Sequence, residues 1–162
     1  MIESSTEDDH DIKWNGMKAM SAAGATQNAL IVVDPGFSKF SLKIAGQISA
    51  KLTRKGYAVT LITANRFQAE GLSKVNLLVL GGPTYVGQPS GRIKQAVQAL
   101  SNGTKLKTLI FVTGGSDCSG LAPLNQLAAE KGLAVVGSCG ILDKREEASN
   151  IEPKINQLLE II

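Results

Sequence analysis

The sequence predicts a three-layer α/β fold, a doubly wound five-stranded parallel sheet with helices on both faces. Short apolar runs and amphipathic segments alternate along the chain from residue 29 to its end. The apolar runs are continuous, as expected for strands that are buried on both faces. With 162 residues, of which 43% are hydrophobic, the chain has enough apolar side chains for one well-buried domain.

Residues 1–28 precede this alternation and differ from it in composition. The first eleven residues contain five acidic residues and no Lys or Arg, and the small residues that follow have no sustained period. Such a composition is typical of segments that form no packed core. We therefore expect a disordered or linker-like acidic tail over residues 1–28 and one domain over residues 29–162. A short helix over residues 13–20 is the alternative for part of the tail.

The strands are expected at the apolar runs, and the helices at the segments between them. Each connection is then a right-handed crossover between parallel strands. In the first helix, apolar residues recur at helical spacing from Leu42 to Leu52, and Gly56 marks the end. A short helical or irregular link is expected after the second strand. The expected strands are residues 30–34, 58–63, 75–81, 108–114 and 134–139. The expected helices are residues 41–56, 93–100, 121–132 and 149–162.

Histidine and cysteine are too scarce for several kinds of site. The one histidine, His10, lies in the acidic tail, so the expected domain has none for a catalytic triad or a histidine metal site. The two cysteines, Cys118 and Cys139, match no zinc spacing. They follow or end the last two expected strands, so a redox pair and two unconnected thiols both remain open. We expect no catalytic side chain and no metal.

Targeting signals are not evident in the sequence. No apolar stretch approaches the ~20 residues of a membrane helix. The acidic start lacks the basic and apolar regions of a secretory signal. We expect a cytoplasmic protein without membrane insertion.

Charge is unevenly distributed along the chain. Residues 12–162 hold 17 basic and 9 acidic residues, a balance of +8. A basic body attracts an acidic partner or an anionic cofactor, although basic residues also simply solvate helix faces. Because these residues are scattered and not interleaved with aromatic ones, we expect no nucleic-acid partner.

Two common nucleotide-binding motifs are absent from the sequence. A Rossmann dinucleotide site has G-x-G-x-x-G after the first strand, whereas residues 34–41 read DPGFSKFS. The P-loop pattern G-x-x-x-x-G-K-[ST] does not occur anywhere. Of the two common strand orders of doubly wound sheets, the order 2-1-3-4-5 is therefore favoured.

The segment after the third expected strand carries the most informative motif. Residues 81–94 read GGPTYVGQPSGRIK. Ligands of open parallel sheets bind at the carboxyl ends of the strands, which is where this segment falls. Gly82 and Pro83 shape a turn whose backbone can lie against a flat ring. Thr84 offers a hydroxyl and Tyr85 an aromatic face. A loop that merely opens the next helix is the alternative interpretation.

The segment after the fourth expected strand has a similar character. Residues 112–121 read VTGGSDCSGL, a glycine-rich segment that offers backbone amides at the end of the strand. The alternative is a glycine-rich turn in which Ser119 caps the next helix.

Over about residues 29–162, the chain resembles the flavodoxin-like family. The family's G-[ST]-P-T-Y-x-G segment matches residues 81–87. The family's Thr-Gly-Asn-Thr phosphate loop falls on residues 38–41, where this chain keeps two hydroxyls but lacks the glycine and the asparagine. The resemblance implies a flavodoxin-like sheet of order 2-1-3-4-5 and FMN as cofactor, with a degenerate phosphate loop that weakens the hold on the FMN phosphate.

The resemblance also implies that three loops contact FMN. The first would hold the phosphate, and the other two would bracket the ribityl chain and the ring. The implied cofactor-binding residues are Ser38, Lys39, Phe40, Ser41, Pro83, Thr84, Tyr85, Gly87, Thr113, Gly114, Gly115 and Ser116.

The resemblance implies that this chain is a flavoprotein that transfers electrons to or from a redox protein partner. Because residues 12–162 are basic, an acidic partner is possible. FMN supplies the chemistry, so we expect an electron carrier rather than a stand-alone catalyst. One alternative is a flavodoxin-fold binding or regulatory module that has lost FMN, which the altered phosphate loop favours. Another is an FMN-dependent NAD(P)H:quinone-type reductase.

Overall fold

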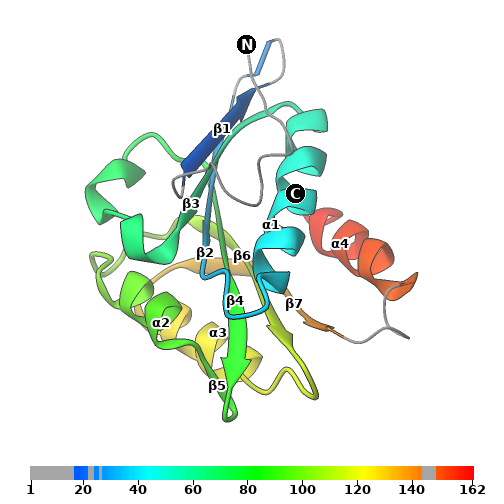
Figure 1. Ribbon diagram of the computed structural model, residues 1–162. Coiled ribbons are helices and arrows are strands. Elements are labelled where there is room, and N and C mark those ends of the chain that lie inside the picture. The colour runs from blue at the N-terminus through cyan, green and yellow to red at the C-terminus, as the bar shows by residue number, and fades with distance from the viewer. Residues whose placement is uncertain (1–16, 22–23, 26, 144–148) are drawn as a thin grey trace.

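Parallel strand pairing builds the central sheet of this protein (Figure 1). The computed structural model describes residues 17–21, 24–25, 27–143 and 149–162. The strands are β1 (Met17–Ser21), β2 (Gln27–Val33), β3 (Tyr57–Thr63), β4 (Leu77–Tyr85), β5 (Gln88–Pro89), β6 (Lys107–Gly114) and β7 (Ala134–Leu142).

The order of the parallel strands confirms the sequence prediction. The sheet runs β1-β3-β2-β4-β6-β7, and the pairs from β3 to β7 are all parallel. Numbered along the chain, these five parallel strands have the order 2-1-3-4-5. The expected boundaries differ from those observed by a few residues, which is usual for element ends.

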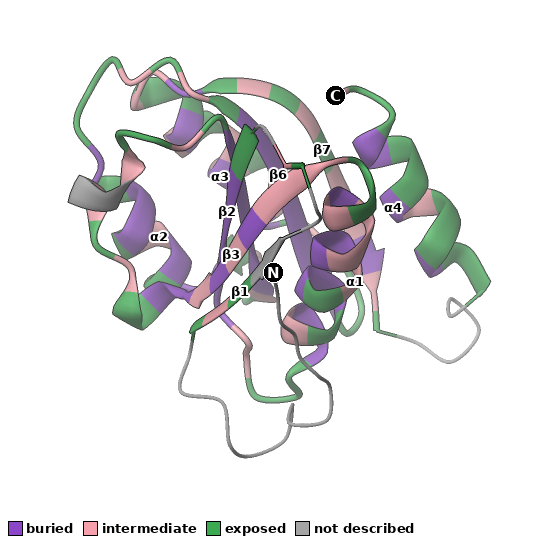
Figure 2. Cartoon of the chain, turned by 90° about the horizontal axis from the view of Figure 1, so that it is seen from above, coloured by how far each residue is buried: buried purple, intermediate pink, exposed green. Residues whose placement is uncertain are grey.

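Two helices cover each face of the sheet. The helices α1 (Phe40–Arg54) and α4 (Ile151–Leu159) pack on one face, and α2 (Gly91–Gln98) and α3 (Leu121–Glu130) pack on the other. Figure 2 shows the sheet between these two layers, with buried residues on the inward side of each helix. Two short 3-10 helices, η2 (Ala64–Arg66) and η3 (Ala69–Leu72), form the expected irregular link after β3. The three-layer prediction is confirmed.

Part of the expected tail belongs to the sheet. Met17–Ser21 forms β1, which pairs antiparallel with β3, and β2 already begins at Gln27. The expectation of a linker, or of a helix, is therefore wrong for Met17–Ser21. The reason is that β3 would otherwise expose an unpaired edge, which β1 covers. The segment MKAMS has no β-branched residue, so its strand signal is weak. Residues 1–16, 22–23 and 26 of the predicted tail lie outside the described residues.

The strand β4 is longer than the apolar run that predicted it. It continues to Tyr85, and a tight hairpin then returns as β5, with Thr84 opposite Pro89 and Tyr85 opposite Gln88. The turn residues Val86 and Gly87 both have positive φ values, 51° and 75°. Two such residues are what a two-residue hairpin turn needs. The motif that follows the apolar run is thus a hairpin rather than an open loop.

A close contact between β4 and β6 fixes the middle of the sheet. Gly81 lies opposite Phe111, and a Cβ built on Gly81 would overlap the Phe111 ring. Phe111 is fully buried in the core on the α1 and α4 face. The sequence needs glycine at position 81 because the neighbouring ring fills the space of its side chain.

We predict that Gly81→Ala lowers the free energy of unfolding by about 1–3 kcal/mol, the usual cost of overpacking a core. The matched control is Gly46→Ala in the middle of α1, where a Cβ would meet nothing within 4 Å. That change should raise stability by roughly 0.5–1 kcal/mol, because alanine favours a helix over glycine. Urea unfolding measures both changes, and equal effects of the two substitutions would contradict the prediction.

Candidate functional site

The loops that follow β2, β4 and β6 meet at one edge of the sheet. The Phe37 N–H donates to the Tyr85 hydroxyl at 3.2 Å, which joins the first loop to the β4–β5 hairpin. The two rings lie 5.5 Å apart at a tilt of 36°. The hydroxyls of Ser41 and Thr113 are 2.7 Å apart, which joins the start of α1 to the end of β6. Parallel pairing produces this meeting, because it places the three carboxyl ends side by side.

The first loop turns sharply after β2. The Asp34 N–H donates to the Gly81 carbonyl at 3.0 Å, and an Asp34 carboxylate oxygen, Oδ1, accepts from the Gly36 N–H at 3.2 Å. Gly36 has φ 76°, and a Cβ there would come within 3.0 Å of the Pro83 ring. The loop therefore needs glycine at position 36 for its conformation and for its approach to β4.

Lys39 keeps a backbone conformation that is rare for its type. It has φ 62° and ψ 17°, in the left-handed region that glycine favours. Lys39 stands where the family's phosphate motif has its glycine. The loop thus keeps a glycine-like turn at this position, and the Lys39 side chain adds an amino group.

The two hydroxyls of this loop already have partners within the protein. Ser41 is 1% exposed and contacts Thr113 as described. Ser38 accepts from the Phe40 N–H through its hydroxyl at 3.3 Å. Phe40 is buried in the core on the α1 and α4 face, so its side chain does not face a ligand. Two of the four side chains at the phosphate-loop positions are therefore buried, whereas Ser38 is exposed and its hydroxyl keeps a hydrogen to donate.

The β4–β5 hairpin presents Tyr85 and Val86 to the surface. Tyr85 is 37% exposed and Val86 is fully exposed, whereas Pro83 is buried. The Thr84 hydroxyl is buried without a hydrogen-bond partner, and it lies 3.0 Å from a Cβ built on Gly120. It therefore faces the start of α3. Of the implied residues in this hairpin, Tyr85 is the one that can offer a ring face.

The loop that follows β6 is a tight turn held by Asp117. An Asp117 carboxylate oxygen accepts from both the hydroxyl and the N–H of Ser119. The hydrogen bond from the Ser119 hydroxyl is the largest cause that lowers the pKa of Asp117 below its usual value, and the hydrogen bond from the Ser119 N–H is the next. Gly114 is buried, whereas Gly115 and Ser116 are exposed. Their backbone is open to a ligand at the edge of the sheet.

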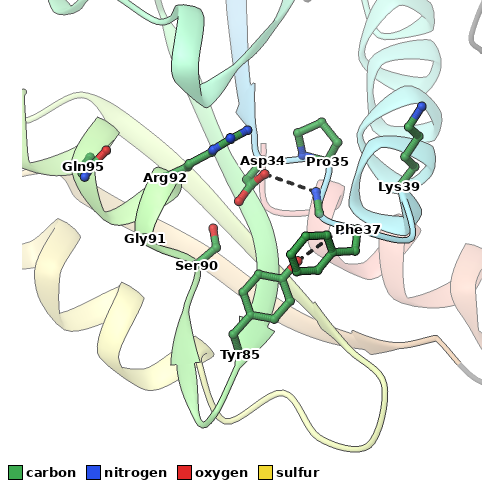
Figure 3. Close-up of a pocket in the computed structure, with 10 residues that line it drawn as sticks. Asp34, Pro35, Phe37, Lys39, Tyr85, Ser90, Gly91, Arg92 and Gln95 are labelled. Atoms are coloured by element: carbon green, nitrogen blue, oxygen red, sulfur yellow. Dashed lines mark hydrogen bonds between the residues drawn. The ribbon is translucent and has the colours of Figure 1, made fainter. Parts of the chain in front are cut away.

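A cavity of about 620 Å³ lies between the first loop and α2 (Figure 3). Its volume is in the range of small-molecule sites. Tyr85 and Phe37 form one wall, the buried Asp34 lies at the floor, and the start of α2 forms the opposite wall. The lining residues are Asp34, Pro35, Gly36, Phe37, Lys39, Tyr85, Ser90, Gly91, Arg92 and Gln95.

The cavity contains two of the residues that the resemblance implies, Lys39 and Tyr85. The implied residues at the end of β6 and in the loop after it do not line the cavity. The sequence had not assigned Phe37 or Gln95 to the site. Phe37 is 94% exposed, and an aromatic residue between a strand and a helix was the one signal that pointed to it.

Solved structures resemble this chain in fold, although no protein-family model and no curated protein sequence matches it. A flavodoxin from Streptococcus pneumoniae TIGR4 has a TM-score of 0.71 and 18% identity, over 83% of this chain and 96% of the other. Oxidised flavodoxin 2 from Bacillus cereus has a TM-score of 0.69 and 18% identity, over 83% and 99%. The chain has a flavodoxin-like fold.

Larger proteins contain a similar unit. The rubredoxin:oxygen oxidoreductase of Desulfovibrio gigas has a TM-score of 0.66 and 12% identity, over 83% of this chain but 36% of the other. The flavodoxin-like fold thus occurs both alone and as part of a longer chain. None of the described helices of the present protein is long and apolar enough to cross a membrane.

The two cysteines of this flavodoxin-like chain lie on opposite faces of its sheet. Cys139, in β7, packs with the core under α1 and α4, whereas Cys118 packs with the core under α2 and α3. Both thiols are free. Burial raises the pKa of both, that of Cys139 to about 11. The arrangement supports two unconnected thiols rather than a redox pair.

We predict that Thr113→Val lowers the free energy of unfolding by about 1–3 kcal/mol, because it leaves the buried Ser41 hydroxyl without its partner. Adding Ser41→Ala should then cost less than Ser41→Ala costs alone. A double-mutant cycle by urea unfolding measures this coupling. Strictly additive effects would show that the hydrogen bond contributes nothing.

The raised pKa of Cys139 predicts a loss of stability at high pH. Between the ordinary value of 9.0 and about 11, the unfolded chain releases this proton while the folded chain keeps it. The free energy of unfolding therefore falls as pH rises through this window, by up to about 2–3 kcal/mol. Cys139→Val should reduce the fall between pH 8.5 and 11, as followed by urea unfolding. An unchanged slope in the variant would contradict the prediction.

Proposed function

We propose that this protein binds FMN and passes electrons to or from a protein partner. The observation that carries the proposal is the 620 Å³ cavity at the carboxyl edge of a flavodoxin-like sheet, with Phe37 and Tyr85 in its wall. Open parallel sheets bind their ligands at this edge. FMN supplies the electron transfer when it is bound, so the side chains need only hold and orient it.

The aromatic wall suits the flat ring of a flavin. The Tyr85 hydroxyl is fixed by the Phe37 N–H, so the Tyr85 ring is held in place before a ligand arrives. A ring that is already oriented loses little freedom on binding. The exposed backbone of Gly115 and Ser116 lies at the same edge and is proposed to contact the polar side of the ring.

The partner is proposed to present an acidic surface. Residues 12–162 carry a balance of +8, and Lys39 and Arg92 line the cavity itself. Complementary charge speeds the encounter of two proteins and orients them. The free thiols Cys118 and Cys139 suit a reducing compartment such as the cytoplasm.

A flavin-free binding module is the second candidate, and one observation favours it. The Ser41 hydroxyl is buried beside that of Thr113, and Phe40 is buried, so the side chains at two of the four phosphate-loop positions do not face a ligand. The visible spectrum of the purified protein after addition of FMN, followed by gel filtration, distinguishes the two candidates. Retained flavin absorbance supports the first, and its loss supports the second.

We predict that Tyr85→Ala weakens FMN binding by about 5- to 150-fold, the range of one lost aromatic stacking contact. Tyr85→Phe keeps the ring and should lose much less. Val86→Ala is the control, because Val86 is the exposed neighbour in the same hairpin and lies outside the cavity lining. Quenching of flavin fluorescence gives the dissociation constants. An unchanged constant in Tyr85→Ala would remove this ring from the site.

A further inference from the structure

We propose that the acidic segment over residues 3–11 docks on the basic start of α1, formed by Lys39 and Lys43, and covers the mouth of the cavity beside it. The contact is autoinhibitory, because an anionic ligand or an acidic partner must displace the segment before it binds. The inhibitory consequence rests on the proposed function, whereas the docking itself does not.

The register of β1 brings the acidic segment to the edge of the sheet that holds the cavity. Because β1 is antiparallel to β3, its first residue, Met17, lies opposite Ile62 near the carboxyl end of β3. Ile62 in turn lies opposite Val32 of β2, two residues before Asp34 at the floor of the cavity. The chain therefore enters the sheet at its carboxyl edge, beside β3 (Figure 1).

The remaining distance is within reach of the segment. One strand separates β1 from β2, so the two lie about 10 Å apart at the usual strand spacing. Asp11 and Asp9 precede Met17 by six and eight residues. Over these lengths an extended chain spans up to about 20 and 26 Å. Both carboxylates can therefore reach the start of α1, which follows β2 through the first loop.

The start of α1 is basic and has no acidic counterpart. Lys39 and Lys43 are exposed and one helical turn apart, since the Lys43 N–H donates to the Lys39 carbonyl at 3.2 Å. Neither amino group has an ion pair with a residue in the described part of the chain. The first turn of α1 contains no acidic residue, and the side chain at its N-cap position makes no hydrogen bond to the helix. Carboxylates are favoured at such a helix start.

The acidic segment has the complementary charge. Residues 1–11 contain five acidic residues and no Lys or Arg. Lys39 lines the cavity, so a carboxylate bound to it lies where a ligand would enter. Exposed ion pairs are individually weak. Two segments of one chain nevertheless meet at an effective concentration of about millimolar, so that a few weak pairs suffice to hold the contact.

Zero-length cross-linking tests the docking. A carbodiimide joins a carboxylate to an amino group that it contacts, and mass spectrometry of the digested full chain identifies each pair. The ion pair between Lys51 and Glu152, with 3.0 Å between its charged atoms, is the internal positive control. Lys55 and Lys107 are the negative controls, because both are exposed and lie at the opposite edge, where β3 and β6 begin.

The expected result is that Asp9 or Asp11 is joined to Lys39 or Lys43 within one chain. These products should be lost in about 1 M salt, where the screening length is only about 3 Å. Products that favour Lys55 or Lys107, or that are spread evenly over the lysines, would overturn the docking. Products between two chains would also overturn it and would assign the contact to a second copy of the protein.

The affinity for FMN, measured by fluorescence quenching, tests the inhibition. Asp9→Asn combined with Asp11→Asn should lower the dissociation constant at least about twofold, as expected when one or two exposed ion pairs are lost. The matched control is Glu130→Gln combined with Glu160→Gln, two exposed acidic residues outside the segment and the cavity lining, which should leave the constant unchanged. Circular dichroism verifies that both variants are folded.

Two further outcomes separate this inference from the proposed function. Equal FMN constants in the segment variant and the unsubstituted chain would overturn the inhibition and leave flavin binding intact. No affinity for FMN in any of these chains would overturn the proposed function, while the cross-links would still decide the docking.

Discussion

Parallel pairing of β4 with both β2 and β6 is the constraint on which the site depends. Because β4 lies between the two, the carboxyl ends of all three strands reach one edge of the sheet. The hydrogen bond from the Asp34 N–H to the Gly81 carbonyl continues the β2–β4 pairing into the first loop. Gly81 also makes room for Phe111, so the packing that fixes the sheet is next to the residues that shape the cavity. Fold and site thus share the same short stretch of β4.

The five parallel strands and their order could be predicted from the sequence. Buried strands appear as continuous apolar runs, and right-handed crossovers between parallel strands limit the possible strand orders to a few. The sequence was not sufficient for β1, whose five residues lack β-branched side chains. The β5 hairpin was also missed, although Val86 and Gly87 stand at its turn. In both cases the structure forms because an existing strand offers unpaired backbone groups, and a local pattern does not contain that information.

The candidate site also has one part that could be predicted from the sequence and another that could not. The position of Tyr85 at the edge of the sheet could be predicted from the strand that precedes it. The contact between Ser41 and Thr113 could not, because these residues are 72 positions apart and meet only through the register of three strands. The cavity likewise joins the first loop to Arg92 on α2. Contacts between separate loops depend on tertiary packing, which no motif describes.

The first loop keeps a glycine-like turn although its residue types differ from those of the family motif. Lys39 retains the left-handed conformation of the glycine that the family motif has there. The Ser38 hydroxyl accepts from the Phe40 N–H within the turn, and the Ser41 hydroxyl joins the loop to Thr113 of β6. Groups that already have partners gain little from a ligand, whereas unpaired groups gain most. In the first loop the Ser41 hydroxyl already has a partner in Thr113, whereas Lys39 is exposed and lines the cavity. The residue types of a motif therefore do not by themselves show which groups of a loop are free for a ligand, because a neighbouring strand supplies a partner to one of them.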